Sequence, residues 1–163
     1  MIEVDPTLPE VVQRFLASGA RLEEIRLDAR GRWWHQGGRI ENRRVVELFS
    51  RSVNRTTGGT WVLEVGRYTY PIVVEDTPFF VESFQSRGTG ERETITLCLV
   101  GGELAELDPD SLRYDDGLGV SCAVRSGQFR ARFLLDAYHA LADRLVDCDE
   151  GYALVVAGRP VQL

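Results

Sequence analysis

The stretch from Thr56 to Val100 constrains the fold more than any other, because it alternates short β-type runs with turn signals. Its runs are rich in Val, Thr, Tyr and Phe, and they are separated by the turn sequences TGG, VGR, DTP and GTG. Such short connections join antiparallel neighbours, since a parallel crossover needs a dozen or so residues. We therefore expect a chain dominated by antiparallel sheet.

Shorter strand signals flank this stretch. The sequence EIRLDARGRWWHQ predicts a hairpin, in which Ile25 and Leu27 alternate with Arg26 and Asp28 and DARG forms the turn. VSCAVR predicts one strand, and YALVVAGRPVQL a single closing strand. Between the β-rich stretch and VSCAVR, LAELDPDSLRYDDGLG is expected to be an irregular acidic loop.

Three segments carry helical signals. TLPEVVQRFLASG has Thr7 and Glu10 at capping-box spacing, and RRVVELFSRSV follows Asn42 as a candidate N-cap. FRARFLLDAYHALADRLV, residues 129–146, has a continuous apolar stripe at helical spacing. The stripe consists of Phe133, Leu134, Ala137, Tyr138, Leu141 and Leu145. Helices toward both ends and strands between them predict an α+β fold of antiparallel, roll-like halves with about three helices.

The chain length suits one compact domain or two small ones. At 163 residues, it can bury a core without a disulfide or a metal. We expect an N-terminal β-rich half with two helices at 1–75 and a C-terminal α+β half at 76–163. A single compact unit is the alternative.

The cysteine pattern and the N-terminal residues predict a cytoplasmic protein. Cys98, Cys122 and Cys148 are odd in number and form no CxxC pair, which favours reduced thiols and gives no zinc-site spacing. MIEVDPTLPE lacks the basic and apolar regions of a secretory signal, and no apolar run approaches the roughly 20 residues of a membrane span. We expect no membrane partner, metal or cofactor.

The charge is unevenly distributed. The net charge is −6, yet eight arginines and three acids lie between Arg26 and Arg55, and all 19 basic residues are arginine. Guanidinium groups grip carboxylates and phosphates in bidentate fashion, whereas overall acidity disfavours general nucleic-acid binding. An anionic small molecule or an acidic protein segment is therefore the expected partner.

Arg43 and Arg44 occupy the first turn of a predicted helix, where the macrodipole disfavours cations. A bound anion at that helix start would reverse the sign of this effect. The alternative is that Glu47 pairs with Arg43 and Arg44, with Glu41 also near.

His35, Glu75 and Asp76 complete the candidate ligand-binding residues. His35 could act as a base or ligand, or be a half-buried histidine near a turn. Glu75 and Asp76 end a strand and, being sequential, point to opposite faces; Asp76 could simply form a turn into Pro78. Three further polar residues share a helical face and fit a solvated surface better than a metal site: Asp136, His139 and Asp143.

Several motifs in order resemble the bacterial family of domain of unknown function 1285 (DUF1285). They are the W-x-H-x-G-x-x-I pattern of Trp33, His35, Gly37 and Ile40, then Leu48-Phe49, Gly59, VEDTPF from Val74 to Phe79, and VRSGQFRARFLLDAYHAL. The resemblance covers roughly residues 25–163 and implies an α+β fold of two small β-rich halves, without an assigned activity. EVGRYTYP and LCLVGG depart from the family pattern, which indicates a divergent member.

No catalytic motif such as a Walker loop, a G-x-S-x-G elbow or HExxH is present. We therefore expect a non-catalytic binding or regulatory module. One alternative is a small enzyme using His35 with Glu75 or Asp76 as acid–base groups. Another is a dimeric protein-interaction module.

Overall fold

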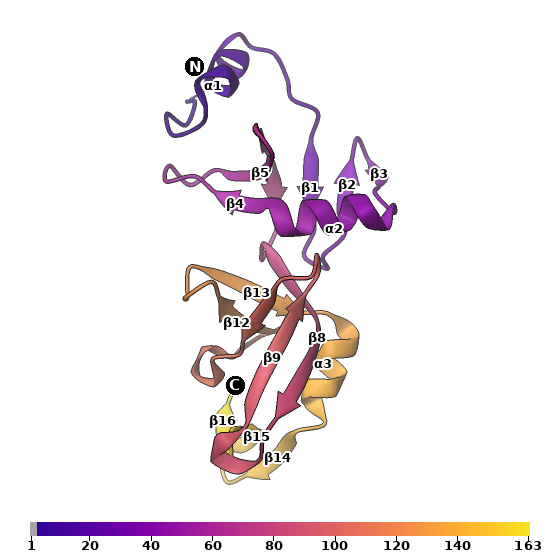
Figure 1. Cartoon of the computed structure of the whole chain (residues 1–163), viewed down its shortest axis with the longest axis vertical. Helices are drawn as coiled ribbons and strands as arrows, with labels where there is room; N and C mark the ends of the chain where they lie inside the picture. The colour runs from indigo at the N-terminus through magenta and orange to yellow at the C-terminus, as the bar shows by residue number, and fades with distance from the viewer. Residues whose placement is uncertain (1–2) are drawn as a thin grey trace. The chain divides into compact units, whose positions relative to one another are not determined.

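The computed structural model describes residues 3–163 and shows an α+β protein. Three α-helices and four β-sheets occur in this range, which confirms the predicted fold class (Figure 1). The chain divides into two compact units, one ending at Pro78 and the other running from Phe79 to Leu163. None of the helices within residues 3–163 has the length and apolar character needed to cross a bilayer.

The first unit contains two helices and two small sheets. One sheet has the order β3-β2-β1-β7, in which only the β1–β7 pair is parallel, and the other has the antiparallel order β4-β5-β6. The elements are α1 (Glu10–Ala17), β1 (Ile25–Leu27), β2 (Trp33–His35), β3 (Gly38–Arg39), α2 (Arg43–Ser52), β4 (Val53–Arg55), β5 (Trp61–Val65), β6 (Tyr68–Pro71) and β7 (Val73–Val74).

Trp33 anchors helix α2 to the first sheet. Its side chain is 1% exposed, and its indole Nε1 donates a hydrogen bond to Ser50 Oγ at 3.1 Å. Its ring meets Phe49 edge-on, with centroids 5.4 Å apart. The hydrogen bond satisfies the one polar group of a large buried side chain, so the same residue supplies both packing and orientation.

Asp5 fixes the N-terminal segment to the β4–β5 turn. Its carboxylate accepts hydrogen bonds from Thr7, Thr56 and Thr60, and Gly58 N donates to Thr7 Oγ1. The capping box expected for Thr7 and Glu10 is therefore wrong. Helix α1 has Pro9 as its N-cap, without a side-chain cap bond, because Thr7 bonds to Asp5 instead.

The second unit is built on a six-stranded sheet with the order β10-β9-β8-β13-β12-β11. β8 and β13 are parallel, and the other neighbours are antiparallel. A three-stranded antiparallel sheet, β14-β15-β16, and helix α3 complete it. The elements are β8 (Phe79–Arg87), β9 (Thr94–Leu99), β10 (Leu104–Glu106), β11 (Arg113–Asp115), β12 (Gly119–Val124), β13 (Phe129–Phe133), α3 (Leu135–Ala142), β14 (Leu145–Cys148), β15 (Gly151–Val156) and β16 (Arg159–Gln162).

A largely buried ion pair connects the two sheets of this unit. Arg144 follows α3 and binds both carboxylate oxygens of Glu93, at 2.7 and 2.8 Å. Ser86 Oγ also donates to this carboxylate, as does the backbone N–H of Ala157 in the β15–β16 turn. Glu93 thus ties the β8–β9 hairpin to the C-terminal hairpin.

Three predicted segments in the C-terminal part of the chain differ from the structure: the helix, the closing strand and the acidic loop. Residues 129–133 form β13 rather than the start of a helix, and residues 145–148 form β14 rather than its end. The closing segment is a hairpin of β15 and β16 instead of one strand, and the acidic loop contains the short strands β10 and β11. In each case pairing with neighbouring strands outweighs the local pattern.

Candidate functional site

The β1–β2 hairpin presents two chemically different faces. Leu27 is paired with Trp33, and Arg26 with Trp34. Because successive side chains of a strand point to opposite faces, Leu27 and Trp33 lie on the face packed against α2, and Arg26 and Trp34 on the outer face. The candidate site is built on this outer face.

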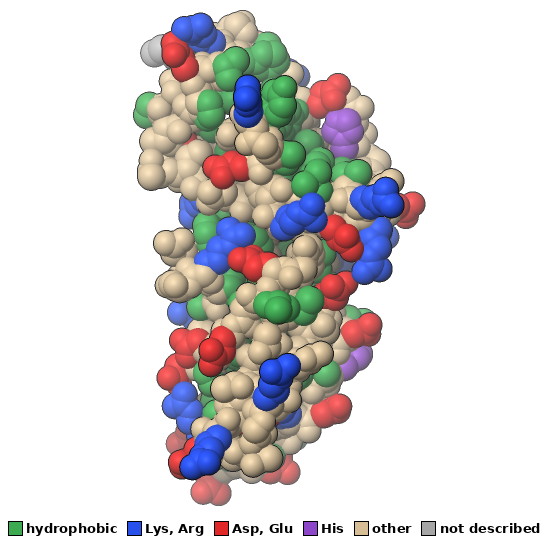
Figure 2. All heavy atoms as spheres, viewed as in Figure 1, with side chains coloured by type: hydrophobic (Ala, Val, Ile, Leu, Met, Phe, Trp, Pro, Cys, Tyr) green, Lys and Arg blue, Asp and Glu red, His purple; other side chains and the backbone are tan. Residues whose placement is uncertain are grey.

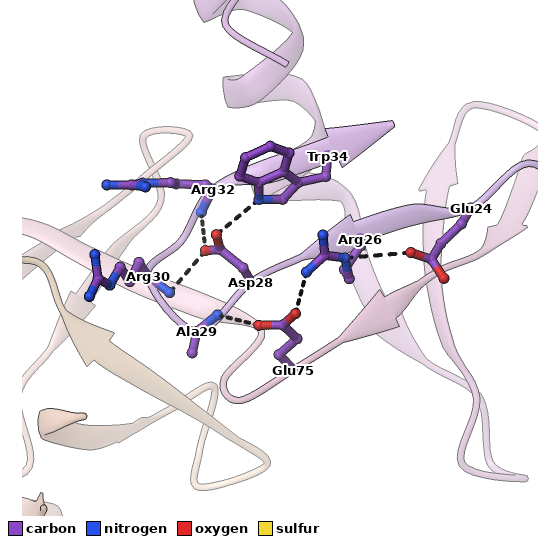
Figure 3. A network of polar contacts seen from close by, with 8 residues as sticks. All are labelled: Glu24, Arg26, Asp28, Ala29, Arg30, Arg32, Trp34 and Glu75. Carbon is purple, nitrogen blue, oxygen red and sulfur yellow. Dashed lines mark hydrogen bonds and ion pairs between the residues drawn. The ribbon is translucent and has the colours of Figure 1, made fainter. Parts of the chain in front are cut away.

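Asp28 organises the turn of the hairpin. Its Oδ1 accepts hydrogen bonds from the backbone N–H groups of Arg30 and Arg32 at 2.9 and 2.8 Å, and its Oδ2 accepts one from Trp34 Nε1 at 2.9 Å (Figure 3). Partial burial acts to raise the pKa of Asp28, but these three bonds lower it below its ordinary value. The carboxylate therefore stays charged, and it orients Trp34.

Arg26 is held by carboxylates from two directions. Its Nη1 pairs with Glu75 Oε1, and its Nε lies 3.4 Å from Glu24 Oε1 (Figure 3). Glu75 also accepts from the backbone N–H of Ala29 at 3.2 Å, and the Arg26 guanidinium lies 5.7 Å from the Trp34 ring centroid. Arg26 is thus already satisfied and acts as a structural cation.

Arg30, Arg32 and Arg39 differ from Arg26 in this respect. Within residues 3–163 their guanidinium groups make no hydrogen bond or ion pair, and all three residues are exposed. Figure 3 shows the side chains of Arg30 and Arg32 directed away from the Asp28 and Glu75 carboxylates. Arg39 is paired with Trp34 across β2 and β3. We call Arg26, Arg30, Arg32, Trp34 and Arg39 the arginine–tryptophan surface.

Basic and acidic side chains lie close together on one face of the first unit (Figure 2). On the face drawn in Figure 2, basic side chains around helix α2 are interspersed with acidic ones. A ligand would therefore meet individual guanidinium groups in a defined arrangement. Long-range attraction of a polyanion such as nucleic acid needs a broader basic area.

The predicted site at the start of helix α2 is occupied by the chain itself. Arg43 Nε bonds Glu47 Oε1 at 2.9 Å, as the alternative reading of the sequence anticipated. Asn42 Oδ1 accepts from the backbone N–H groups of Arg44 and Val45, at 3.0 and 3.3 Å, which confirms it as the N-cap. An anion at this position would have to displace the Asn42 cap. The group in this region that remains open to a ligand is the exposed Arg44 side chain.

His35 pairs with a residue that the sequence did not single out. Its Nε2 lies 3.0 Å from Glu23 Oε2, and Tyr70 hydrogen-bonds the backbone oxygen of Glu23. His35 shares the face of β2 on which Trp33 lies, whereas Glu75 binds Arg26 on the outer face. His35 and Glu75 therefore do not form an acid–base pair in this structure.

Glu75 and Asp76 diverge after β7. Glu75 is exposed and belongs to the Arg26 network, while Asp76 is half-buried at the approach to Pro78. The five predicted residues thus lie in four different surroundings. His35 lies beside Glu23, Arg43 and Arg44 at the helix start, Glu75 at the hairpin and Asp76 at the approach to Pro78.

Arg26, Asp28 and Trp34 were not predicted from the sequence as one network. A signal was present, because Asp28 begins the DARG turn, and Arg26 alternates with apolar neighbours. Nothing local indicated Glu75 as the partner of Arg26, since 49 residues separate them. The parallel pairing of β7 with β1 brings them together.

An apolar pocket of about 240 Å³ lies between α1 and β6. Figure 2 shows hydrophobic side chains gathered near α1 on the face that it draws. The main apolar residues that line this pocket are Val11, Val12, Phe15, Leu22, Tyr68 and Tyr70, and Arg67 is the one cation among its lining residues.

Among the described residues, no group of three or more His, Cys, Asp and Glu side chains could hold a metal ion.

Comparison with known proteins identifies structural neighbours only. No protein-family model and no curated protein sequence matches the chain. The structure is similar to that of a DUF1285 family protein from Silicibacter pomeroyi DSS-3, with a TM-score of 0.66 and 22% identity, over 85% of this chain and 78% of that one. It is also similar to a DUF1285 family protein from Shewanella baltica OS155, with a TM-score of 0.57 and 16% identity, over 75% and 92% of the two chains. The resemblance expected from the sequence is confirmed as a shared fold.

Proposed function

We propose that the chain is a divergent member of the DUF1285 family and a non-catalytic binding module of the bacterial cytoplasm. Its ligand would be an anionic small molecule or an acidic segment of a partner protein. The shared fold supports membership, and the low identity supports divergence. Three free thiols are in keeping with a reducing compartment.

The observation that carries the proposal is the contrast between satisfied and unsatisfied arginines on one hairpin. Glu24 and Glu75 engage Arg26, and Asp28 is committed to the turn and Trp34. The carboxylates near the hairpin are therefore already hydrogen-bonded or paired. Within the described part of the chain, the guanidinium groups of Arg30 and Arg32 remain available to bind a ligand (Figure 3).

The chemistry of these groups favours carboxylates. A guanidinium group presents donors in a planar fork that matches a carboxylate, and charge-assisted bonds are stronger than neutral ones. The Trp34 indole N–H is committed to Asp28, so its ring face is what it can offer a ligand. An extended segment with several carboxylates could meet the arginines one after another.

A labelled poly-glutamate peptide provides the direct test, with fluorescence anisotropy as the measurement. The Arg30→Gln/Arg32→Gln variant should raise the dissociation constant roughly tenfold or more, which corresponds to about 1.4 kcal/mol. A second variant, Arg43→Ala/Arg44→Ala, measures the contribution of the helix start.

The matched control is Arg21→Gln/Arg51→Gln, which removes two exposed arginines of the same unit that lie outside both the hairpin and the apolar pocket. It lowers the charge equally, so it should change the affinity much less if binding is local. Equal weakening by the two double variants, or no binding by the wild-type protein, would remove the proposal.

A protein-interaction module is the second candidate, and the apolar pocket favours it. Val11 and Tyr68 are 73% and 81% exposed beside it, and β6 is an edge strand that could pair with another chain. Light scattering on the wild-type protein and on Val11→Ser/Tyr68→Ser separates the two ideas. A dimer that dissociates in the variant supports interaction, and a monomer in both contradicts it.

A further inference from the structure

The sheet of the second unit places three arginines on one face. Arg113 on β11 is paired with Ser121 on β12, and Ser121 with Arg132 on β13. Directly paired residues have their side chains on the same face, about 5 Å apart at Cβ. Arg130 lies two residues before Arg132 in the same strand, so it joins this face.

These arginines differ in whether a carboxylate is bonded to them. Arg132 is 4% exposed, and its Nη1 donates to Asp115 Oδ2 at 3.0 Å and to the backbone oxygen of Gly119 at 2.9 Å. Arg130 Nη2 donates to Ser121 Oγ at 2.8 Å. Within residues 3–163 no carboxylate is bonded to Arg113 or Arg130.

Arg130 is therefore a half-buried cation whose bonded partner is neutral. Burial lowers its pKa, and the positive charges of Arg113 and Arg132 lower it further. A protein ordinarily balances such a charge with a carboxylate, because an unpaired charge away from water is costly. The nearby Asp115 carboxylate acts on Arg130 as well, but Arg132 binds it. An external anion would therefore add the balance that Arg130 and Arg113 lack.

We infer that Arg113 and Arg130, supported by the buried Ser121 and Arg132, form a binding site for a phosphate group. A phosphate carries up to two negative charges and three acceptor oxygens, which fits two unneutralised guanidinium groups. Ser121 is only 2% exposed and accepts from Arg130 Nη2, so its role is to hold the Arg130 guanidinium in position for the ligand. This phosphate site consists of residues of the second unit, whereas the arginine–tryptophan surface consists of residues of the first.

Isothermal titration of the full chain with inorganic phosphate tests the site, with acetate at equal ionic strength as the comparison ligand. Phosphate should bind the wild-type protein more tightly than acetate. Arg113→Gln and Arg130→Gln should each weaken phosphate binding about tenfold. The control Arg87→Gln changes an exposed arginine at the end of β8 in the same sheet, and it should leave binding unchanged.

Thermal unfolding gives a second readout that does not depend on tight binding. Without phosphate, Arg113→Gln should raise Tm, because it removes repulsion from Arg130. With phosphate, the Tm of the wild-type protein should rise more than that of the variant. A lower Tm for Arg113→Gln, equal phosphate responses, or loss of phosphate binding in Arg30→Gln/Arg32→Gln instead would overturn the assignment.

Discussion

At the scale of single residues, Gly58 lies where only a glycine fits beside Asp5. A Cβ at Gly58 would lie 2.0 Å from Asp5 Oδ1, so Gly58→Ala should expel the carboxylate from its three threonine partners. Those hydrogen bonds hold the pKa of Asp5 well below its ordinary value. We expect the variant to return this pKa toward the ordinary range and to speed amide exchange at Thr7 roughly tenfold.

Gly38→Ala is the matched control for that experiment. An added Cβ at Gly38 would meet only the His35 backbone oxygen, at 3.5 Å, which is an ordinary contact. NMR titration of both variants measures the Asp5 pKa directly. An unchanged pKa in Gly58→Ala would show that Asp5 does not depend on the close approach at this glycine.

The candidate site was only partly predictable from its residues. Local chemistry placed Asn42 as a helix cap and Glu47 as a partner of Arg43, because both contacts lie within one helical turn. The pairing of Glu75 with Arg26 could not be predicted from the sequence, because it depends on the pairing of β1 with β7, which are distant in the chain. The partner of His35, Glu23, likewise depends on how the segment before β1 returns to β2.

At the scale of elements, the Glu93–Arg144 pair should make the second unit acid-sensitive. Hydrogen bonds from Arg144 and Ser86 lower the pKa of Glu93 from 4.5 to about 2. Because the folded pKa is depressed, this stabilisation is present above pH 4.5 and is lost as the pH falls toward 2. Glu93→Gln should cost about 3 kcal/mol at neutral pH and should flatten that part of the pH profile.

The control is the Arg159–Asp110 pair, whose side chains are 52% and 71% exposed. Asp110→Asn should change the free energy of unfolding by less than about 1 kcal/mol, since exposed pairs contribute little. Denaturant unfolding at several pH values measures both variants. Equal effects for the two substitutions would contradict the role assigned to Glu93.

Local signals predicted some elements well and misplaced others for an identifiable reason. The β1–β2 hairpin and helix α2 have their turn residue and cap within the segment itself, and both predictions are confirmed. Residues 129–133 carry part of a helical stripe, yet they pair with β12 on one side and β8 on the other. One of the strands that makes residues 129–133 a β-strand is β8, which begins at Phe79 and is too far away in the sequence for a local pattern to include it.

At the scale of the whole molecule, we propose that the two compact units are separate domains. Each has its own fully buried side chains, such as Leu27 and Trp33 in the first and Leu97 and Leu141 in the second. Fragments ending at Pro78 and beginning at Phe79 should each unfold cooperatively, although with low stability, because domains of this size bury a modest fraction of their surface. Thermal melts followed by circular dichroism would contradict this if either fragment lacked a cooperative transition.

The central claim is that unsatisfied arginines on the β1–β2 hairpin hold an anionic ligand, and the arginine side chains themselves report on it. Proton–nitrogen NMR of the Nε–Hε groups during titration with a poly-glutamate peptide follows each guanidinium separately. We expect saturable chemical-shift changes for Arg30 and Arg32 and small changes for Arg26, because Glu75 and Glu24 already bind Arg26. Changes spread evenly over the exposed arginines, or none at Arg30 and Arg32, would contradict the central claim.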